Sequence, residues 1–215
     1  MPDRGAPVPK PYEGIADDLR RRPPVAVVRD NGRHQWEKNR AREPLAERAR
    51  TGATEHDTGL RRQDLAIHAR YREIEAPREL AEAFGVPEGT ALVERTYRTR
   101  CAAGSAPFGL VTSYLVRELV AGNPDLLDER NEPWPGSTQN QLFTVGIEVD
   151  RVEERITARP PTPEEAEELE LAPGTPVILL RKTSYAIDGR VVDVCDVTLP
   201  GDRTELVFTT PLERW

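Results

Sequence analysis

The chain has 215 residues, a formal net charge of −7 and only two cysteines. This length suits one medium-sized domain with a real hydrophobic core, and the acidic balance disfavours nonspecific binding of the whole molecule to nucleic acid. No apolar run approaches the roughly 18 residues that a membrane helix needs, and the N-terminus lacks the apolar core of a signal peptide. We therefore expect a cytoplasmic protein with no membrane partner.

The N-terminal residues predict a tail followed by one helix. Residues 1–11 are rich in proline and glycine and are expected to be disordered. Residues 12–22 (YEGIADDLRRR) place four apolar side chains at helical spacing, and Pro23 and Pro24 end the pattern. Residues 36–50 predict a second helix, which Pro44 would interrupt.

Alternating apolar residues then predict a strand at 60–75 with one buried face. The elements expected after it are a helix at 76–84, strands at 90–101 and 106–116, a helical or irregular stretch at 118–127, a short helix at 137–145, a strand at 147–159 with a bulge near Val152, a helix at 163–171, strands at 175–187 and 191–199, and a short strand at 206–210. The hairpin turn Asp188–Gly189 between apolar strands is the strongest local signal in the chain.

Two stretches of the chain share one plan of helix, glycine turn and β-hairpin. Gly89 corresponds to Gly174 and Gly104 to Gly189, at one offset of 85 residues (174 − 89 and 189 − 104). The apolar positions align at the same offset, which indicates an internal two-fold repeat. Hairpins with interspersed helices are typical of an α+β domain with a mainly antiparallel sheet.

No catalytic or metal-binding constellation stands out in the sequence. His34, His56 and His68 lack partners at metal or triad spacing, so we expect surface or structural roles for them. Cys101 and Cys195 lack the spacing of a zinc site or a disulfide framework and are expected to be reduced thiols. We expect no cofactor and no metal.

A pair of arginines on one predicted strand is more informative. Arg98 and Arg100 are two residues apart, so both side chains leave the same face of the sheet, whereas Arg95 points the other way. Neighbouring carboxylates could neutralise the pair on a solvated face. Alternatively, the two guanidinium groups could clamp a phosphate or a carboxylate.

Polar residues elsewhere could complete such an anion site. Ser137, Thr138 and Gln139 open a predicted helix, where free backbone N–H groups and hydroxyls could contact an anion. An ordinary N-cap by Ser137 explains the same residues equally well. Asp193, in the last hairpin strand, could accept hydrogen bonds from ligand hydroxyls or pair with an arginine.

Four segments together resemble the UTRA ligand-sensing domain of the HutC branch of GntR-type bacterial transcription regulators. They are APRELAEAFGVPEGTALVERTYRTR, FGLVTSYL, ITARPPTPEEAEELELAPGTPVILLRKTSYAIDGRVVDV and GDRTEL. The resemblance covers about residues 33–214 and is specific only as a set. It implies a chorismate lyase-like fold and a dimer that binds a small effector, such as a sugar phosphate or an organic acid, and thereby changes its affinity for DNA.

The resemblance also assigns candidate effector-binding residues. Arg98 and Arg100 match the family's paired anion-binding arginines, and the Ser137 region matches the helix start that contributes donors. Asp193 stands where the family usually has glutamate, which shortens its reach by one methylene. Tyr114, in the segment FGLVTSYL, completes the candidate set with Thr138 and Gln139.

The sequence departs from the family at its N-terminus. Regulators of this type begin with a winged helix-turn-helix, whose first helix resembles PYEGIADDLRRR, but here PPVAVV and the sensor follow at once. We therefore expect residues 1–32 to be a tail and a remnant of that helix, and residues 33–215 to form the sensor. Little specific DNA binding is expected, with action as a homodimer or as a mixed dimer with a full-length relative. The alternative is a chorismate lyase-like enzyme acting on a carboxylate substrate.

Overall fold

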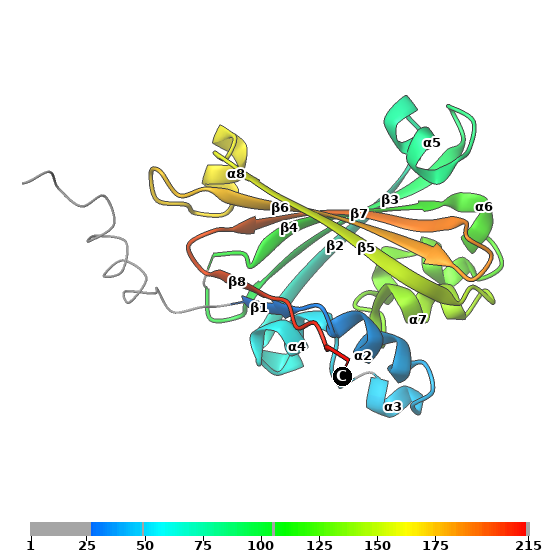
Figure 1. Cartoon of the computed structure of the whole chain (residues 1–215), viewed down its shortest axis with the longest axis horizontal. Helices are drawn as coiled ribbons and strands as arrows, with labels where there is room; N and C mark the ends of the chain where they lie inside the picture. Colours follow the sequence, from blue (N-terminus) through cyan, green and yellow to red (C-terminus); the bar gives the residue numbers. More distant parts are fainter. Residues whose placement is uncertain (1–26, 49, 105, 214–215) are drawn as a thin grey trace, which may run out of the picture.

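Six antiparallel strands form the centre of the molecule, in the order β2-β3-β4-β7-β6-β5 (Figure 1). The computed structural model describes residues 27–48, 50–104 and 106–213, so the helix predicted at 12–22 lies outside the described residues. The strands are β2 (Leu65–Glu75), β3 (Ala91–Cys101), β4 (Gly109–Val116), β5 (Val149–Arg159), β6 (Val177–Ala186) and β7 (Val191–Pro200). The predicted α+β class with a mainly antiparallel sheet is confirmed.

The sheet is built from two copies of one unit, which confirms the predicted repeat. The first unit is β2, helix α5 (Arg78–Phe84), β3 and β4; the second is β5, helix α8 (Pro163–Glu168), β6 and β7. The two helices begin 85 residues apart (163 − 78), the offset seen in the sequence. The units join through β4 and β7 in the middle of the sheet, so β2 and β5 become its two edges.

Strand alternation gives the sheet two different faces. One face, which we call the inner face, carries Arg95, Tyr97 and Thr99 of β3; the opposite, outer face carries Arg98 and Arg100. Helices α2 (Arg33–Arg40), α4 (Ala53–Thr58) and α7 (Ser137–Phe143) lie below the sheet in Figure 1, on the inner side, whereas α5 and α8 lie above it. The other short helical segments are α3 (Leu45–Arg48), α6 (Arg117–Val120), η1 (Arg62–Asp64), η2 (Pro124–Leu127) and η3 (Glu129–Asn131).

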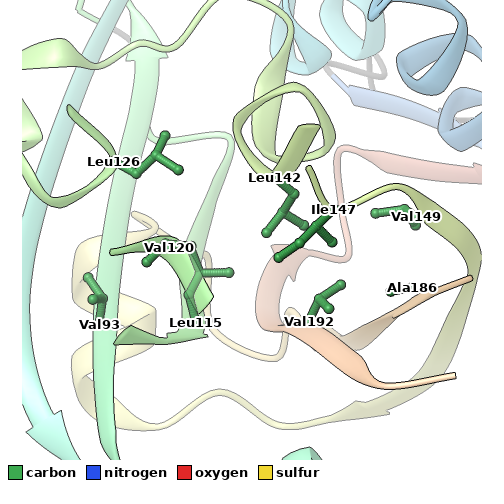
Figure 2. Close-up of a cluster of buried hydrophobic side chains, with 9 residues drawn as sticks. All are labelled: Val93, Leu115, Val120, Leu126, Leu142, Ile147, Val149, Ala186 and Val192. Carbon is green, nitrogen blue, oxygen red and sulfur yellow. The ribbon is translucent and has the colours of Figure 1, made fainter. Parts of the chain in front are cut away.

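A buried apolar cluster fixes α7 against the inner face (Figure 2). Leu142 of α7 and Leu115 of β4 are both fully buried, and Val93, Val149 and Val192 complete the strand side of the cluster. Burial of one such leucine contributes about 1.5–3 kcal/mol. This cluster therefore anchors the C-terminal turn of α7 on the sheet.

A second apolar cluster covers the outer face. Leu80 and Phe84 of α5 pack on Leu92, Val116 and Val194, which come from β3, β4 and β7. Apolar residues at these outward positions explain why α5 packs on one end of these strands.

The segment before β2 differs from the prediction in three ways. Strand β1 (Val27–Asp30) pairs in parallel with β8 (Thr204–Val207), so the folded body begins before the expected boundary at residue 33. The single helix expected at 36–50 is two helices, α2 and α3, because Pro44 cannot continue a helix. Helix α4 was not predicted at all, since its sequence ATEHDT shows no apolar periodicity. None of the helices in the described ranges is long and apolar enough to cross a membrane.

The irregularity predicted near Val152 is confirmed. The register shift in the pairing of β5 with β6 lies between Val149 and Arg151. The shift explains why alternation in this strand could not be followed from one end to the other.

The two repeat helices end in the same left-handed turn with different residues. Gly85 ends α5 with φ +68°, and Glu170, one repeat later, has φ +51°. The turn hydrogen bonds also correspond: Val86 N–H donates to the Ala81 carbonyl, and Leu171 N–H donates to the Ala166 carbonyl. Only glycine adopts this conformation without steric cost, so the second unit holds a strained residue.

Replacing Glu170 with glycine is expected to raise the free energy of unfolding by about 0.5–1 kcal/mol, because the strain disappears. The matched change Gly85→Glu at the equivalent position is expected to lower it by about 1 kcal/mol. Urea denaturation of both variants measures the two effects. Equal stability of E170G and the wild-type protein would contradict the strained turn.

Candidate functional site

A cavity of about 210 Å³ lies between the inner face of the sheet and the segments that cover it. Ile67, Val111 and Val197 give it apolar walls from β2, β4 and β7. Its charged lining residues are Arg29, Arg33, Glu37, Glu55, Asp57, Arg62, Glu132 and Lys182. Because charge is costly to bury, so many charged groups around one small space indicate a site rather than a packing defect.

A buried carboxylate lies in the sheet beneath the cavity. Ser113 Oγ donates a hydrogen bond to Asp193 Oδ1 at 2.7 Å, and Lys182 Nζ lies 3.1 Å from Asp193 Oδ2. Arg95 Nη2 in turn donates to Ser113 Oγ at 2.7 Å. Burial alone would raise the pKa of Asp193, but Lys182 and Arg95 outweigh it and hold this pKa below its ordinary value. Asp193 is therefore an ionised counter-charge for two cations.

A second carboxylate gathers donors at the other end of the cavity. Glu132 Oε1 accepts a hydrogen bond from Tyr97 at 3.0 Å and from Gln141 Nε2 at 2.9 Å, and Tyr71 donates to it as well. Arg95 Nη1 donates to Gln141 Oε1 at 2.6 Å and so links Glu132 to the hydrogen-bond network around Asp193. Burial raises the pKa of Tyr71 to about 12, so its phenol is a neutral donor at physiological pH.

Ion pairs between the covering segments and the sheet close the cavity. Arg29 Nη2 donates to Glu154 Oε1 of β5 at 3.4 Å, and His34 Nε2 lies 3.1 Å from the same oxygen. Within α2, Arg33 Nη2 also donates to Glu37 Oε1 at 3.3 Å. Burial raises the pKa of Glu154, but His34, Arg29 and Arg33 together outweigh this and lower it to about 2. The N-terminal segment is therefore held over the cavity by charge.

Three donor atoms at the cavity wall have no hydrogen-bond partner within the described part of the chain. They are Arg29 Nε, Arg33 Nε and Ser137 Oγ, and all three are buried. A buried donor without an acceptor costs about 1–3 kcal/mol. All three groups can donate, so the wall is suited to a ligand that accepts hydrogen bonds.

The structure brings only some of the predicted site residues together. Ser137 and Thr138 line the cavity, and Asp193 lies beneath it. Gln139 turns away: its Nε2 donates to the His34 carbonyl at 3.0 Å, which ties α7 to α2. Of its two predicted roles, Asp193 takes that of an ion-pair partner: Arg95 Nη2 lies 3.7 Å from its Oδ1, and Lys182 is a second cation beside it.

The arginine pair does not meet Ser137. Arg98 and Arg100 share one face of the sheet, as predicted, but that is the outer face, and the cavity lies on the inner one. Arg98 donates to Glu168 of α8, so this arginine takes the alternative role of a neutralised pair. Spacing shows that two side chains share a face, but it cannot show which face the helices will cover.

Tyr114 also lies on the outer face, where it packs against the cluster formed by Leu80, Phe84 and Val194. Its position two residues from Val116, on the same face of β4, excludes it from the inner cavity.

The charged cavity residues that were not predicted include Arg29, Arg33, Asp57 and Lys182. Lys182 had a usable signal, because it stands one repeat after Tyr97, at the same offset of 85 (182 − 97). The other three lie in segments without periodicity, so no pattern indicates what their side chains would face.

Comparison with known proteins identifies the domain. The family model "UTRA domain" matches residues 66–205. The chain belongs to the UTRA family. An uncharacterized HTH-type transcriptional regulator of Streptomyces coelicolor is 34% identical over 120 residues, which are 56% of this chain and 44% of that protein. An HTH-type transcriptional regulator of Mycobacterium tuberculosis is 28% identical over 143 residues, covering 63% and 48% of the two chains.

Solved structures show the same fold. A GntR-family transcriptional regulator matches with a TM-score of 0.61 and 27% identity, over 69% of this chain and 60% of the other. The effector domain of PhnF from Mycobacterium smegmatis matches with a TM-score of 0.58 and 22% identity, over 70% and 90%. The fold is thus the chorismate lyase-like fold of UTRA effector domains, while this UTRA chain spans about half the length of the two curated relatives above.

Glu154 provides a test of the charged closure. Its folded pKa of about 2 lies below its ordinary value of 4.5, so its stabilisation is present above pH ~4.5 and is lost as pH falls toward 2. Glu154→Gln is expected to lower the free energy of unfolding at pH 7 by about 3 kcal/mol and to flatten its pH dependence in that window. Urea denaturation at a series of pH values measures both effects.

The matched control is Glu153→Gln, on the same strand but on the opposite face, where Glu153 pairs with exposed Arg155. This change is expected to shift stability by less than about 0.5 kcal/mol. If the two variants show equal pH profiles, Glu154 does not hold the N-terminal segment in place.

Proposed function

We propose that this UTRA domain senses a small anionic effector, such as a sugar phosphate or an organic acid, and that binding controls transcription. The ligand occupies the cavity between the inner face of the sheet and helices α2, α4 and α7. The observation that supports this most directly is the set of buried, unpartnered donors at the cavity wall, on Arg29, Arg33 and Ser137.

The chemistry of these donors favours an oxygen-rich anion. Arg29 and Arg33 present planar guanidinium groups, which suit the paired oxygens of a carboxylate or a phosphate. Lys182 adds a third cation from β6, and Thr138 adds a hydroxyl. Apolar side chains on the opposite wall would contact the carbon skeleton of such a ligand. The revised site is therefore Arg29, Arg33, Ser137, Thr138 and Lys182.

The regulatory role rests on the family. The relatives are named HTH-type transcriptional regulators, and the structural neighbours include a GntR-family regulator. We infer that the domain acts in a dimer, either with itself or mixed with a full-length relative, and that it contributes little DNA binding of its own. Its role is to bind the effector without chemical turnover.

A cavity-filling change tests the location of the site. Thr99 lines the cavity from β3, whereas Thr96 on the same strand faces outward. Thr99→Phe is expected to abolish the thermal stabilisation given by phosphosugars or organic acids, because the ring takes the ligand's space. Thr96→Phe is the control and is expected to keep the stabilisation.

Differential scanning fluorimetry with a panel of these anions measures the effect, followed by calorimetry for the best ligand. Mass spectrometry of the recovered ligand separates a sensor, which returns it unchanged, from an enzyme. If T99F binds the ligand with unchanged affinity, the ligand binds outside this cavity. Formation of a product over hours would show an enzyme and reject the sensor function.

A further inference from the structure

The cavity is completed by a segment that the UTRA family match does not include. The match begins at residue 66, whereas β1, α2 and α4 all precede it. This segment supplies Arg29 and Arg33 on one side and Asp57 on the other. Six of the eight charged residues that line the cavity therefore come from this covering segment, and Lys182 is the one that comes from the sheet.

Asp57 of α4 lies between Arg29 and Arg33, the two arginines whose Nε donors lack a hydrogen-bond partner among the described residues. Its Oδ1 is 3.2 Å from Arg33 Nε, and its Oδ2 is 3.6 Å from Arg29 Nη1. Despite these short distances, Arg33 Nε makes no hydrogen bond, since its N–H does not point at the carboxylate. The carboxylate neutralises both cations by proximity, without the paired geometry that makes such contacts strong.

Asp57 also belongs to a short element with glycines at both ends. Helix α4 has six residues, with Gly52 before it and Gly59, at φ +70°, after it. Its first turn is anchored, because Glu55 accepts hydrogen bonds from Gly52 N–H at 2.9 Å and from Arg62 Nη1 at 2.9 Å. Among the residues that the structure describes, the one hydrogen-bond contact of the Asp57 carboxylate is with His56 Nδ1, at 3.4 Å. The Asp57 carboxylate is thus less firmly held by hydrogen bonds than the Glu55 carboxylate.

We propose that Asp57 is a built-in substitute for the ligand's anionic group, and that an oxyanion binds between Arg29 and Arg33 by displacing the Asp57 carboxylate. The proposal rests on the function proposed above and specifies how that site is filled when no ligand is bound. The ligand class is a carboxylate or phosphate with two oxygens placed for both guanidinium groups.

The physical reason for the exchange is hydrogen-bond geometry. Burial raises the pKa of Asp57 above its ordinary value despite Arg33 and Arg29, so the two arginines compensate its charge incompletely. A free oxyanion can align with Arg29 Nε and Arg33 Nε, which the tethered carboxylate does not. Displaced Asp57 gains water, and α4 moves at its glycine ends.

Removal of the substitute tests the proposal. Asp57→Asn is expected to bind inorganic phosphate or succinate about tenfold more tightly than the wild-type protein, because the competitor has lost its charge. Calorimetry gives the affinities, and the two probes distinguish a phosphate site from a carboxylate site. Asp57→Asn combined with Arg33→Gln is expected to lose the gain.

The matched control is Asp64→Asn, which removes the same charge from an exposed aspartate that pairs with Arg61 outside the cavity. It is expected to leave phosphate and succinate affinity unchanged. An equal gain in affinity for phosphate or succinate in D57N and D64N would show a general charge effect and would overturn the proposal.

A measurement on the wild-type protein covers the case in which D57N fails to fold. Hydrogen exchange is followed with and without phosphate, in peptides that span α4 and in peptides that span β3. Faster exchange in α4 with slower exchange in β3 is expected on binding, whereas unchanged or slower exchange in α4 overturns the displacement.

The two proposals fail separately. If an anion from the panel stabilises the wild-type protein and D57N binds it no more tightly, Asp57 is not a substitute, and the cavity remains the effector site. If no anion stabilises either protein and T99F changes nothing, the anionic effector itself is rejected.

Discussion

The pairing of buried charges governs the arrangement of this domain. An uncompensated ion away from water costs several kcal/mol, so each buried cation near the cavity must face an anion. Asp193 meets this requirement for Lys182 and Arg95 within the sheet. Glu154 and Glu37 meet it for Arg29 and Arg33, and the pair of Arg29 with Glu154 joins the N-terminal segment to β5 of the sheet. The cavity exists because these pairs occupy its edges and not its centre.

The internal repeat explains how the sheet can carry such a site on one side only. The two units share one framework of helix and strands, but equivalent positions in them carry different residues. Tyr97 in the first unit and Lys182 in the second occupy corresponding places on the inner face, and both line the cavity. A symmetric framework thus presents a phenol from one half and an ammonium group from the other.

Much of the fold could be predicted from the sequence, because it follows from local signals. The glycines at 89 and 174 and the hairpin at Asp188–Gly189 determine the turns, and the offset of 85 determines the repeat. Less of the site could be predicted, because which face a strand buries depends on helices distant in sequence. Arg98 and Arg95 show the difference. Strand alternation correctly predicts that they lie on opposite faces of the sheet, but it does not show that the buried face is that of Arg95 and not that of the predicted pair Arg98 and Arg100.

The segment before residue 66, which covers the cavity, links ligand binding to the N-terminal side of the domain. Arg29 lies on β1 and Arg33 on α2, so a ligand that changes their partners also changes the free energy with which this segment docks. Linkage makes the effect reciprocal: whatever restrains the segment from its N-terminal side must alter ligand affinity by the same factor. A typical coupling of 1–3 kcal/mol is comparable to one ion pair in this network. The exchange of a single carboxylate for a ligand oxyanion is therefore large enough to serve as the signal.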